Sequence, residues 1–475
     1  MATSKVITGV IWSSIQRFGT MVISFVTNIV LARLLTPEDF GTIGMLLFFL
    51  AIANTFIDSG FGSALIQKKD ANQIDFSTVF FINLGLSAVI YAVLFMGAPW
   101  VAHFYNVAVL SPLLRVQGVV LFMNAFCIIQ ISLLRKKMDF KKLSVCNLVG
   151  NIVGSLIGIG AAVGGLGVWS LVVRTLVVGF TTSLMLWIVG RWKPLFVFSR
   201  QSFRELFSFG GFMLLSSIVT TIGNNIQTLI IGKLFRPDLL GHYTQAKQLR
   251  DVSSMSISAI VNQVIYPDFS IIKNDTEQLK RHLLLSVSIL SFIVVPMMGI
   301  LILISKPLIE LLYSNTWLPA VPYFEVLCFG GVFLSLQDIN FNLVAAVGKS
   351  NILFYSNATQ VIVSILMQIV GGKLWGMMGL LWAMVVSSFL FYCVYAVLAS
   401  KQTGTSVWEQ LKYILKHTFF SLIAYAGAYF LLCRIDYSDI FMIIIGILSF
   451  SVIYIASAFL SHSEVLKYLI AVIKK

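Results

Sequence analysis

The stretch FSTVFFINLGLSAVIYAVLFMGA, residues 76–98, runs for 23 residues without a charged side chain. A helix of about 20 apolar residues crosses about 30 Å of hydrocarbon. Backbone that faces lipid must satisfy its own hydrogen bonds, so a run of this kind forms a helix. A transmembrane β-barrel would instead show alternating apolar and polar residues. The stretch therefore predicts a membrane-spanning helix.

Runs of the same kind recur along the whole chain. Of its 475 residues, 58% are hydrophobic and 11% are charged, whereas soluble domains carry about 25% charged residues. We expect an all-α polytopic membrane protein with about fourteen spans. The expected spans are residues 7–34, 42–66, 76–98, 113–134, 143–164, 168–190, 206–233, 242–267, 283–304, 322–346, 350–372, 377–399, 417–433 and 439–460. The first is too long for a signal-peptide core and is expected to be retained.

The basic residues predict how these spans are oriented. If the N-terminus is cytoplasmic, 22 of the 33 Lys and Arg residues fall in cytoplasmic segments and seven on the opposite side. The positive-inside rule then places both termini in the cytoplasm. This distribution also accounts for most of the net charge of +14. No nucleic-acid partner is therefore needed to explain the charge.

The cysteines give no sign of a metal site or a disulfide. The five residues are Cys127, Cys146, Cys328, Cys393 and Cys433. All lie in or beside apolar runs and none forms a CxxC pair, so we expect small packing residues. We expect no cofactor and no metal.

The chain contains an internal repeat at an offset of 200 residues. RLLTPEDFG at 33–41 matches KLFRPDLLG at 233–241, and GGLGV at 164–168 has a weaker echo in GMMGL at 376–380. An even number of spans per copy predicts two parallel lobes, related by an axis along the membrane normal. We expect an N-terminal lobe at 1–204, a C-terminal lobe at 205–400, and two appended helices at 401–475. A cavity between two such lobes is typical of alternating-access transporters.

Polar residues recur at helical spacing inside three expected spans. Steps of three and four place such residues on one helix face, and polar groups within the membrane tend to face a cavity or another helix. The first span carries Ser13, Arg17, Thr20, Ser24 and Asn28; the span at 206–233 carries Ser217, Thr221, Asn224 or Asn225, and Thr228; the span at 242–267 carries Lys247, Arg250, Asp251, Ser254, Ser258 and Asn262. These stripes predict a polar site.

The bases in these stripes suit an anionic ligand, because Arg and Lys both bind phosphate. The substrate-binding candidates are Arg17, Lys247, Arg250, Asn28, Asn224 and Asn225. The amides and hydroxyls suit sugar hydroxyls. Alternatively, Arg17 snorkels to the cytoplasmic face, and Lys247 and Asp251, four residues apart, neutralise each other. Arg250 has no such obvious partner in the sequence.

Three acids are candidates for coupling to H⁺ or Na⁺: Asp58, Asp338 and Asp251. Asp58 alternatively pairs with Arg17 across two helices. Asp338, flanked by Gln337 and Asn340, is alternatively a protonated acid in a packed helix. No paired carboxylate or nucleophile motif accompanies the scattered histidines, so we do not expect an enzyme.

Three segments resemble a known family: WSSIQR at 12–17, LARLLTPEDFG at 31–41 and DSGFGSALIQ at 58–67. They are similar to the Wzx-type polysaccharide flippases of the multidrug/oligosaccharidyl-lipid/polysaccharide exporter superfamily. The resemblance implies two six-helix lobes around a central cavity. It implies transfer of an undecaprenyl-diphosphate-linked oligosaccharide across the bacterial inner membrane, for surface polysaccharides such as O antigen or capsule. Basic cavity residues would hold the diphosphate, and Arg17 matches by position, whereas Lys247 and Arg250 rest on the stripe alone.

Other functions remain open at this point. A cation-coupled drug or metabolite exporter would suit an acidic cavity better than a basic one. Charge does not separate a polysaccharide flippase from a peptidoglycan-precursor flippase. A membrane polymerase or ligase would need catalytic groups, often on a sizeable extracytoplasmic loop, and the expected outer loops are short.

Overall fold

The computed structural model describes the backbone of residues 2–58, 61–68, 70–434 and 438–461, and within these ranges the side chains at 2–6, 58, 61, 63, 67, 205–213 and 255–264 are not described. No strand occurs in these ranges, and the expected all-α class is confirmed. The helices are α1 Ala2–Leu34, α2 Pro37–Asp58, α3 Phe61–Gln67, α4 Gln73–Tyr105, α5 Leu110–Gln117, α6 Val120–Lys136, α7 Phe140–Val163, α8 Trp169–Gly190, α9 Arg200–Leu234, α10 Pro237–Ile272, α11 Thr276–Leu303, α12 Ser305–Tyr313, the 3₁₀-helix η1 Asn315–Ala320, α13 Val321–Ala346, α14 Ser350–Thr403, α15 Val407–Leu432 and α16 Asp439–Leu460.

Twelve helical segments in the described part are long and apolar enough to cross a membrane. The expected count of fourteen differs at two places and stays a prediction. The 54-residue helix α14 covers two expected spans, and Trp375 and Gly376 within it leave helical geometry. Gly376 has a φ of 64°, which a glycine adopts without steric cost. The helix α10, which covers the expected span 242–267, is not among the twelve.

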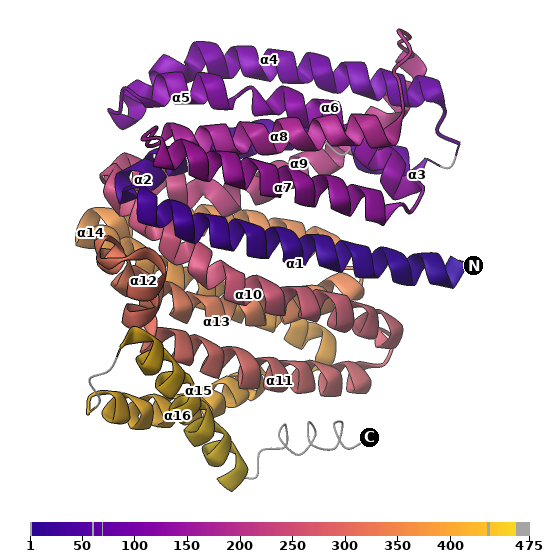
Figure 1. Cartoon of the computed structure of the whole chain (residues 1–475). Coiled ribbons are helices and arrows are strands. Elements are labelled where there is room, and N and C mark those ends of the chain that lie inside the picture. The colour runs from indigo at the N-terminus through magenta and orange to yellow at the C-terminus, as the bar shows by residue number, and fades with distance from the viewer. Residues whose placement is uncertain (1, 59–60, 69, 435–437, 462–475) are drawn as a thin grey trace. The chain divides into compact units, whose positions relative to one another are not determined.

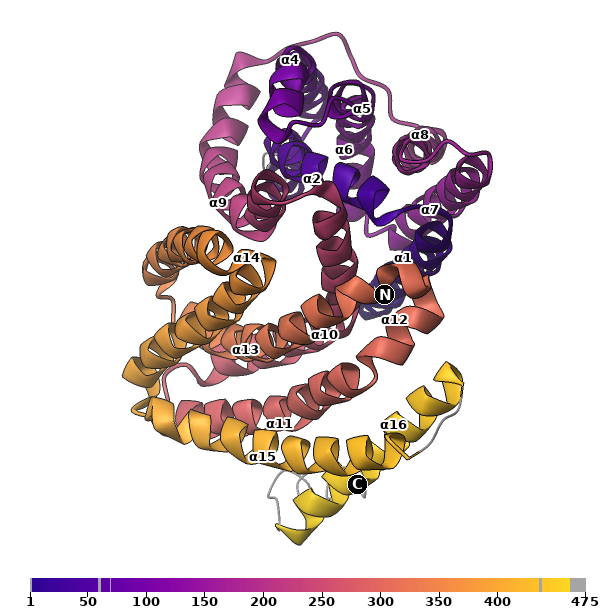
Figure 2. The ribbon, with the colours of Figure 1, turned by 90° about the vertical axis from the view of Figure 1, so that its left-hand side faces the viewer.

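The chain packs as two units, Met1–Gly241 and His242–Lys475. In the first unit, α7 packs against α1 and α8, α2 packs against α9, and α4 packs against α5 and α6 (Figure 1, Figure 2). In the second, α13 packs against α14, and α11 packs against α13 and α15. The expected division into lobes at 1–204 and 205–400, with two appended helices at 401–475 outside the repeat, follows the sequence repeat and stays a prediction.

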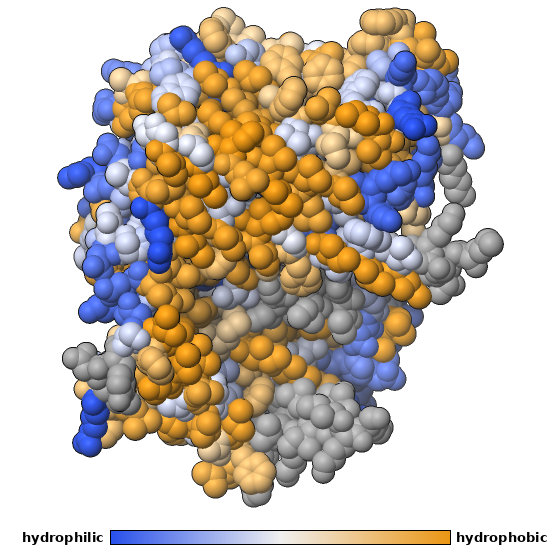
Figure 3. Space-filling view, in the orientation of Figure 1, coloured by the Kyte–Doolittle hydropathy of each residue, from blue (hydrophilic) through white to orange (hydrophobic). Residues whose placement is uncertain are grey.

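The surface of the first unit shows the pattern of a membrane-spanning bundle. Hydrophobic side chains cover the flanks of α4, α5, α7 and α8, and hydrophilic side chains gather at both ends of these helices (Figure 3). In lipid the apolar flank needs no protein partner, because the solvent is itself apolar.

The repeat motif has a direct structural meaning. Pro37 and Pro237 each begin a helix, where the missing N–H costs nothing. Gly41 and Gly241 lie against these repeat-related starts: a Cβ added to Gly41 would be 1.7 Å from the Pro237 carbonyl oxygen, and one added to Gly241 would be 1.8 Å from that of Pro37. The two copies of the motif therefore contact each other backbone to backbone, and only glycine fits.

Candidate functional site

Helix α1 carries two stripes of different character. The exposed apolar side chains at spacings of three and four are Ile11, Ile15, Phe18, Val22 and Val26. At about 100° per residue, the centre of this stripe lies about 200° around the helix from the centre of the polar stripe of Ser13, Arg17, Thr20, Ser24 and Asn28. The apolar stripe suits lipid. The polar stripe therefore lies on the face turned away from the lipid-suited one.

Arg17 lies about 15 Å along the axis from Ile7, where the apolar part of α1 begins. This is about half of the 30 Å hydrocarbon thickness. The Arg17 side chain is exposed. An exposed guanidinium at this depth must reach water, through a water-filled space or by snorkelling. Its position opposite the apolar stripe favours the water-filled space.

Helix α1 is held by α7, which fixes how the polar stripe is presented. The Ser144 hydroxyl of α7 donates to the Trp12 carbonyl oxygen at 2.9 Å. A Cβ at Gly19 would be 2.8 Å from a methyl carbon of Leu148. Nearer the C-terminal end of α1, Asn28 is buried, so its amide is not accessible to a ligand in this conformation.

The second group of charges lies on α10. Arg250 is 6% exposed. Its Nε donates to Asp251 Oδ1 at 2.8 Å, and its Nη2 contacts the same oxygen. The Arg250 Cδ also packs against Gly331 of α13. The expectation that Arg250 has no obvious partner is wrong, because the carboxylate next to it in the sequence turns towards its guanidinium.

Lys247 lies close enough to interact electrostatically with both Asp251 and Arg250. The cluster of these three residues contains two basic side chains and one acidic side chain. Asp251 was expected to neutralise Lys247, and in the structure its carboxylate interacts with both Lys247 and Arg250. A phosphate approaching this cluster would compete with the Asp251 carboxylate for the Arg250 guanidinium.

The amides on α9 belong to a polar group of the first unit. Asn224 is exposed and Asn225 is half-buried. The Asn225 amide donates to the Thr221 carbonyl oxygen at 2.9 Å. The Thr221 hydroxyl bonds to the Thr55 hydroxyl of α2 at 2.8 Å. This bond joins the polar side chains of α9 and α2.

A second interhelix bond lies next in sequence on α2. The exposed Asn124 amide of α6 donates to Asn54 Oδ1 at 2.7 Å. Sequence reasoning missed Asn54, Thr55 and Asn124. A signal was available, because Asn54 precedes the candidate Asp58 by four residues and shares its helix face. Polar side chains from α2, α6 and α9 thus form a hydroxyl- and amide-rich group inside membrane-spanning helices.

The remaining candidate acids are Asp58 on α2 and Asp338 on α13. The side chain of Asp58 lies outside the described residues, as do those of Ser258 and Asn262. Asp338 is half-buried on α13. Its neighbour Gln337 donates to Gln360 Oε1 of α14 at 3.2 Å, so this part of α13 has a polar contact with α14. Within the described residues, no cluster of three or more His, Cys, Asp or Glu side chains suits a metal ion.

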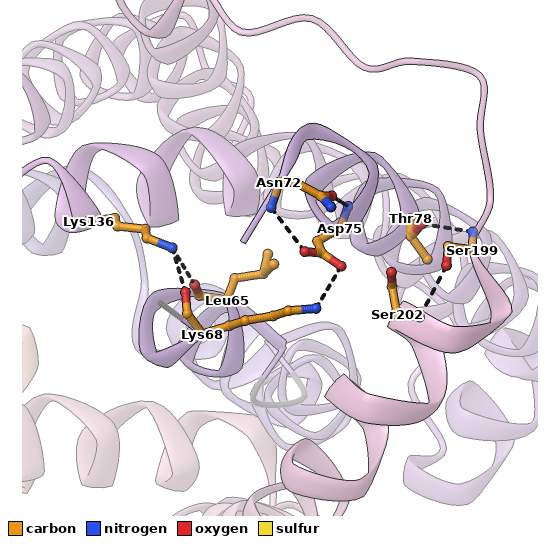
Figure 4. Close-up of polar contacts among 8 residues, drawn as sticks. All are labelled: Leu65, Lys68, Asn72, Asp75, Thr78, Lys136, Ser199 and Ser202. Carbon is orange, nitrogen blue, oxygen red and sulfur yellow. Dashed lines mark hydrogen bonds and ion pairs between the residues drawn. The ribbon is translucent and has the colours of Figure 1, made fainter. Parts of the chain in front are cut away.

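The bases at one end of the first unit are engaged locally (Figure 4). Lys68 pairs with Asp75 at 3.0 Å, and the Asp75 carboxylate also accepts from the Asn72 backbone N–H at 3.0 Å in a capping box. Lys136 donates to the carbonyl oxygens of Lys68 and Leu65, at 2.6 and 3.5 Å. These contacts close the end of α3 and the start of α4, which is a structural role.

The second unit also carries an apolar groove along α14. One cavity of about 580 Å³ lies between the two arms of α14 near Trp375 and Gly379. A second, of about 510 Å³, shares Val386 with the first and continues towards Leu398. The lining is apolar, so the groove suits hydrocarbon chains and does not suit a charged head group.

The fold and the polar groups within its spans define a polytopic membrane protein with the fold of lipid flippases and multidrug exporters. The chain is similar to the lipid II flippase MurJ in an inward closed conformation, with a TM-score of 0.79 over 96% of this chain and all of that one, at 16% identity. It is also similar to an inward-facing multidrug resistance MATE family transporter, with a TM-score of 0.63 over 84% of this chain and all of that one, at 15% identity.

Residues 30–322 match the family described as "Polysaccharide biosynthesis protein", and the chain belongs to this family. Its relatives include the teichuronic acid biosynthesis protein TuaB of Bacillus subtilis, 26% identical over 74% of both chains. The lipopolysaccharide biosynthesis protein WzxC of Escherichia coli is 24% identical over 82% of this chain and 80% of that one. The succinoglycan biosynthesis transport protein ExoT of Rhizobium meliloti is 27% identical over 72% and 70%.

These matches confirm the resemblance to polysaccharide flippases. ExoT is named a transport protein and MurJ a flippase, so these relatives and neighbours are not enzymes, in agreement with the expectation for this chain.

Proposed function

We propose that this protein moves an undecaprenyl-diphosphate-linked oligosaccharide repeat unit across the bacterial inner membrane, from the cytoplasmic leaflet, for surface-polysaccharide biosynthesis. The observation that carries the proposal is the exposed guanidinium of Arg17 about halfway through a span, in a chain of the polysaccharide biosynthesis family. A cation at this depth suits a lipid-linked anion whose tail stays in the bilayer.

In this proposal Arg17 and Lys247 attract the diphosphate, and Arg250 joins them when the ligand displaces Asp251. Arg binds phosphate through two parallel hydrogen bonds, whereas Lys acts as a point charge. The amides of Asn28, Asn224 and Asn225 then meet sugar hydroxyls, with Asn28 becoming accessible as the conformation changes. A switch of access from one side of the membrane to the other releases the head group.

Coupling to H⁺ or Na⁺ would use Asp251, Asp58 or Asp338. Among these, Asp251 accepts a hydrogen bond from Arg250. Ion binding at this carboxylate would therefore change how Arg250 binds the diphosphate. Protonation of Asp251 would release the guanidinium to the diphosphate. Asp251→Asn should then keep transport but lose its dependence on the proton gradient, measured in proteoliposomes. Transport that still follows the gradient in this variant would leave coupling to Asp58 or Asp338.

The proposal is tested by complementing a deletion in the native host with Arg17→Ala and measuring surface polymer together with lipid-linked intermediates. Arg17→Ala should abolish surface polymer and trap a complete lipid-linked repeat unit on the cytoplasmic side, at normal protein level. Arg236→Ala is the matched control, because Arg236 is an exposed arginine in the loop between α9 and α10. Full transport by the triple alanine variant at Arg17, Lys247 and Arg250 would refute the cationic site.

Two alternatives give different results on deletion of the gene. The similarity of the fold to the MATE transporter keeps a cation-coupled drug or metabolite exporter open; deletion would then leave surface polymer normal, trap no intermediate and raise drug sensitivity. The similarity to MurJ keeps a peptidoglycan-precursor flippase open. Depletion would then cause lysis and accumulation of the peptidoglycan precursor, with no specific loss of surface polymer.

The proposed orientation has both termini in the cytoplasm, from the distribution of basic residues. A green fluorescent protein fused after Lys475 should fluoresce, and an alkaline phosphatase fused there should be inactive. The opposite pattern would mean that every span crosses the membrane in the opposite direction to the one proposed.

A further inference from the structure

The segment Arg191–Ser199, which connects α8 to α9, carries an unusual apolar surface outside the spans. Its backbone is not helical. Four consecutive apolar side chains are exposed: Leu195 by 47%, Phe196 by 94%, Val197 by 45% and Phe198 by 60%. Contiguous exposed apolar side chains of this size mark an interaction surface.

This segment is held in place by side chains of α4. The Leu195 backbone N–H donates to the Ser77 hydroxyl at 2.9 Å. The Ser199 backbone N–H donates to the Thr78 hydroxyl at 3.1 Å (Figure 4). The two contacts bracket the apolar residues 195–198. The backbone on both sides of Phe196 is therefore fixed against α4.

The start of the segment is anchored in the same way. Trp192 is buried, and its indole N–H donates to Gln73 Oε1 at 2.7 Å. The Gln73 amide donates in turn to the Lys193 carbonyl oxygen at 2.6 Å. One tryptophan of the segment thus points into the protein, while the two phenylalanines that follow point outward. The exposure of Phe196 and Phe198 is a built feature of the fold.

The apolar surface lies at the border between the hydrophobic flank and the polar end of the first unit. The segment forms the projection beside the upper right end of α4 in Figure 1. At this place Figure 3 shows hydrophobic side chains next to hydrophilic ones. The Phe196 ring lies 5.5 Å from the ring of Phe81 on α4, centroid to centroid. The apolar surface thus continues that of a membrane-spanning helix.

Exposed bases flank the apolar residues on both sides. They are Arg191, Lys193, Arg200 and Arg204. Basic side chains at a membrane surface are attracted to anionic lipids, and apolar side chains next to them enter the boundary between head groups and acyl chains. The exposed bases and the apolar side chains therefore both suit the surface of a membrane that contains anionic lipids.

We propose that Arg191–Ser199 is an interfacial anchor, in which Phe196 and Phe198 insert below the head groups and the four bases bind phosphates of anionic phospholipids. The anchor would tie the α8–α9 connection to one leaflet. By the distribution of basic residues this is the cytoplasmic leaflet. The proposal does not depend on what the protein transports.

Depth-dependent quenching tests the insertion. A Phe196→Cys variant in a Cys393→Ala, Cys433→Ser background is labelled with an environment-sensitive fluorophore and placed in phosphatidylglycerol nanodiscs. The control is Lys273→Cys, an exposed residue of the loop between α10 and α11. Shallow doxyl lipids should quench the label at 196 at least threefold more than at 273. Equal quenching of both labels by aqueous iodide would overturn the insertion.

The role of the bases is tested by changing the lipid and the protein separately. Replacing phosphatidylglycerol with phosphatidylcholine should lower doxyl quenching at position 196 by about half. Combined Arg191→Glu, Lys193→Glu and Arg200→Glu substitutions should remove this lipid dependence without changing thermal stability in detergent. Quenching that is the same in both lipids for the unsubstituted bases would overturn the anionic-lipid contact.

Discussion

The contact between the two repeat motifs makes a sharp prediction about Gly41→Ala. The added methyl group would lie 1.7 Å from the Pro237 carbonyl oxygen, whereas ordinary contact begins at 3.4 Å. Both partners are backbone at the start of long helices, so no side chain can rotate away. The two helix starts would have to separate by about 1.7 Å.

The size of the effect follows from this displacement. Inserting a methyl group into a well-packed core costs about 1–3 kcal/mol. Because the clash here involves backbone, we expect the upper end, about 3 kcal/mol. For a unit of this size, that lowers the apparent Tm by roughly 6–12 °C.

The assay is thermal unfolding of the purified protein in detergent, with Gly160→Ala as the matched control. Gly160 lies on α7, and a Cβ there would meet no atom within 4 Å. Its replacement should leave the Tm unchanged or raise it slightly, because Ala is the better helix former. The reciprocal Gly241→Ala should destabilise like Gly41→Ala, and the two should be less than additive because they open the same gap. A Gly41→Ala variant as stable as Gly160→Ala would refute the backbone contact.

Three further outcomes are expected from stability measurements in detergent. Asp251→Asn should lower stability by about 2 kcal/mol, less than the ~3–5 kcal/mol of a fully buried pair, because Arg250 loses its counter-ion but Asp251 is 31% exposed; an unchanged Tm would mean that water already solvates Arg250. Asn72→Ala should cost about 1 kcal/mol, because it removes the capping box that begins α4, and Asn72→Ser should restore most of this loss. Burial alone would raise the pKa of Asp139, but the hydrogen bonds from Lys142 outweigh burial and hold this pKa below its ordinary value of 3.8. The ionised Asp139 therefore stabilises the fold above about pH 4, and this stabilisation is lost at lower pH. Asp139→Asn should flatten the dependence of Tm on pH in that range.

Much of the fold was readable from the sequence because its signals are local. Length and hydrophobicity of each run decide whether a segment crosses the membrane. The residues 33–41 and 233–241 showed the repeat because a proline start and a glycine four residues later recur in both. The same reasoning separated the expected spans 350–372 and 377–399, and Trp375 and Gly376, which leave helical geometry, lie between these two ranges.

The candidate site was only partly predictable. Helical spacing gave the stripe of α1, and the structure supplied its opposite apolar face. Spacing predicted that Asp251 and Lys247, four residues apart, neutralise each other, and the structure adds a hydrogen bond from Arg250 to the same carboxylate. Arg250 is also packed against Gly331, a residue 81 positions further on, and helical spacing within α10 does not predict that neighbour.

The sequence by itself determined that this protein is a helical membrane protein of the polysaccharide biosynthesis family, because hydrophobic length and short motifs are properties of neighbouring residues. Only the tertiary structure decided that Gly41 faces Pro237, that Thr55 reaches Thr221, and that α4 holds the segment at 191–199. These are contacts between residues far apart in the chain. They depend on which helix faces come together, and a pattern among neighbouring residues does not specify which distant residues meet.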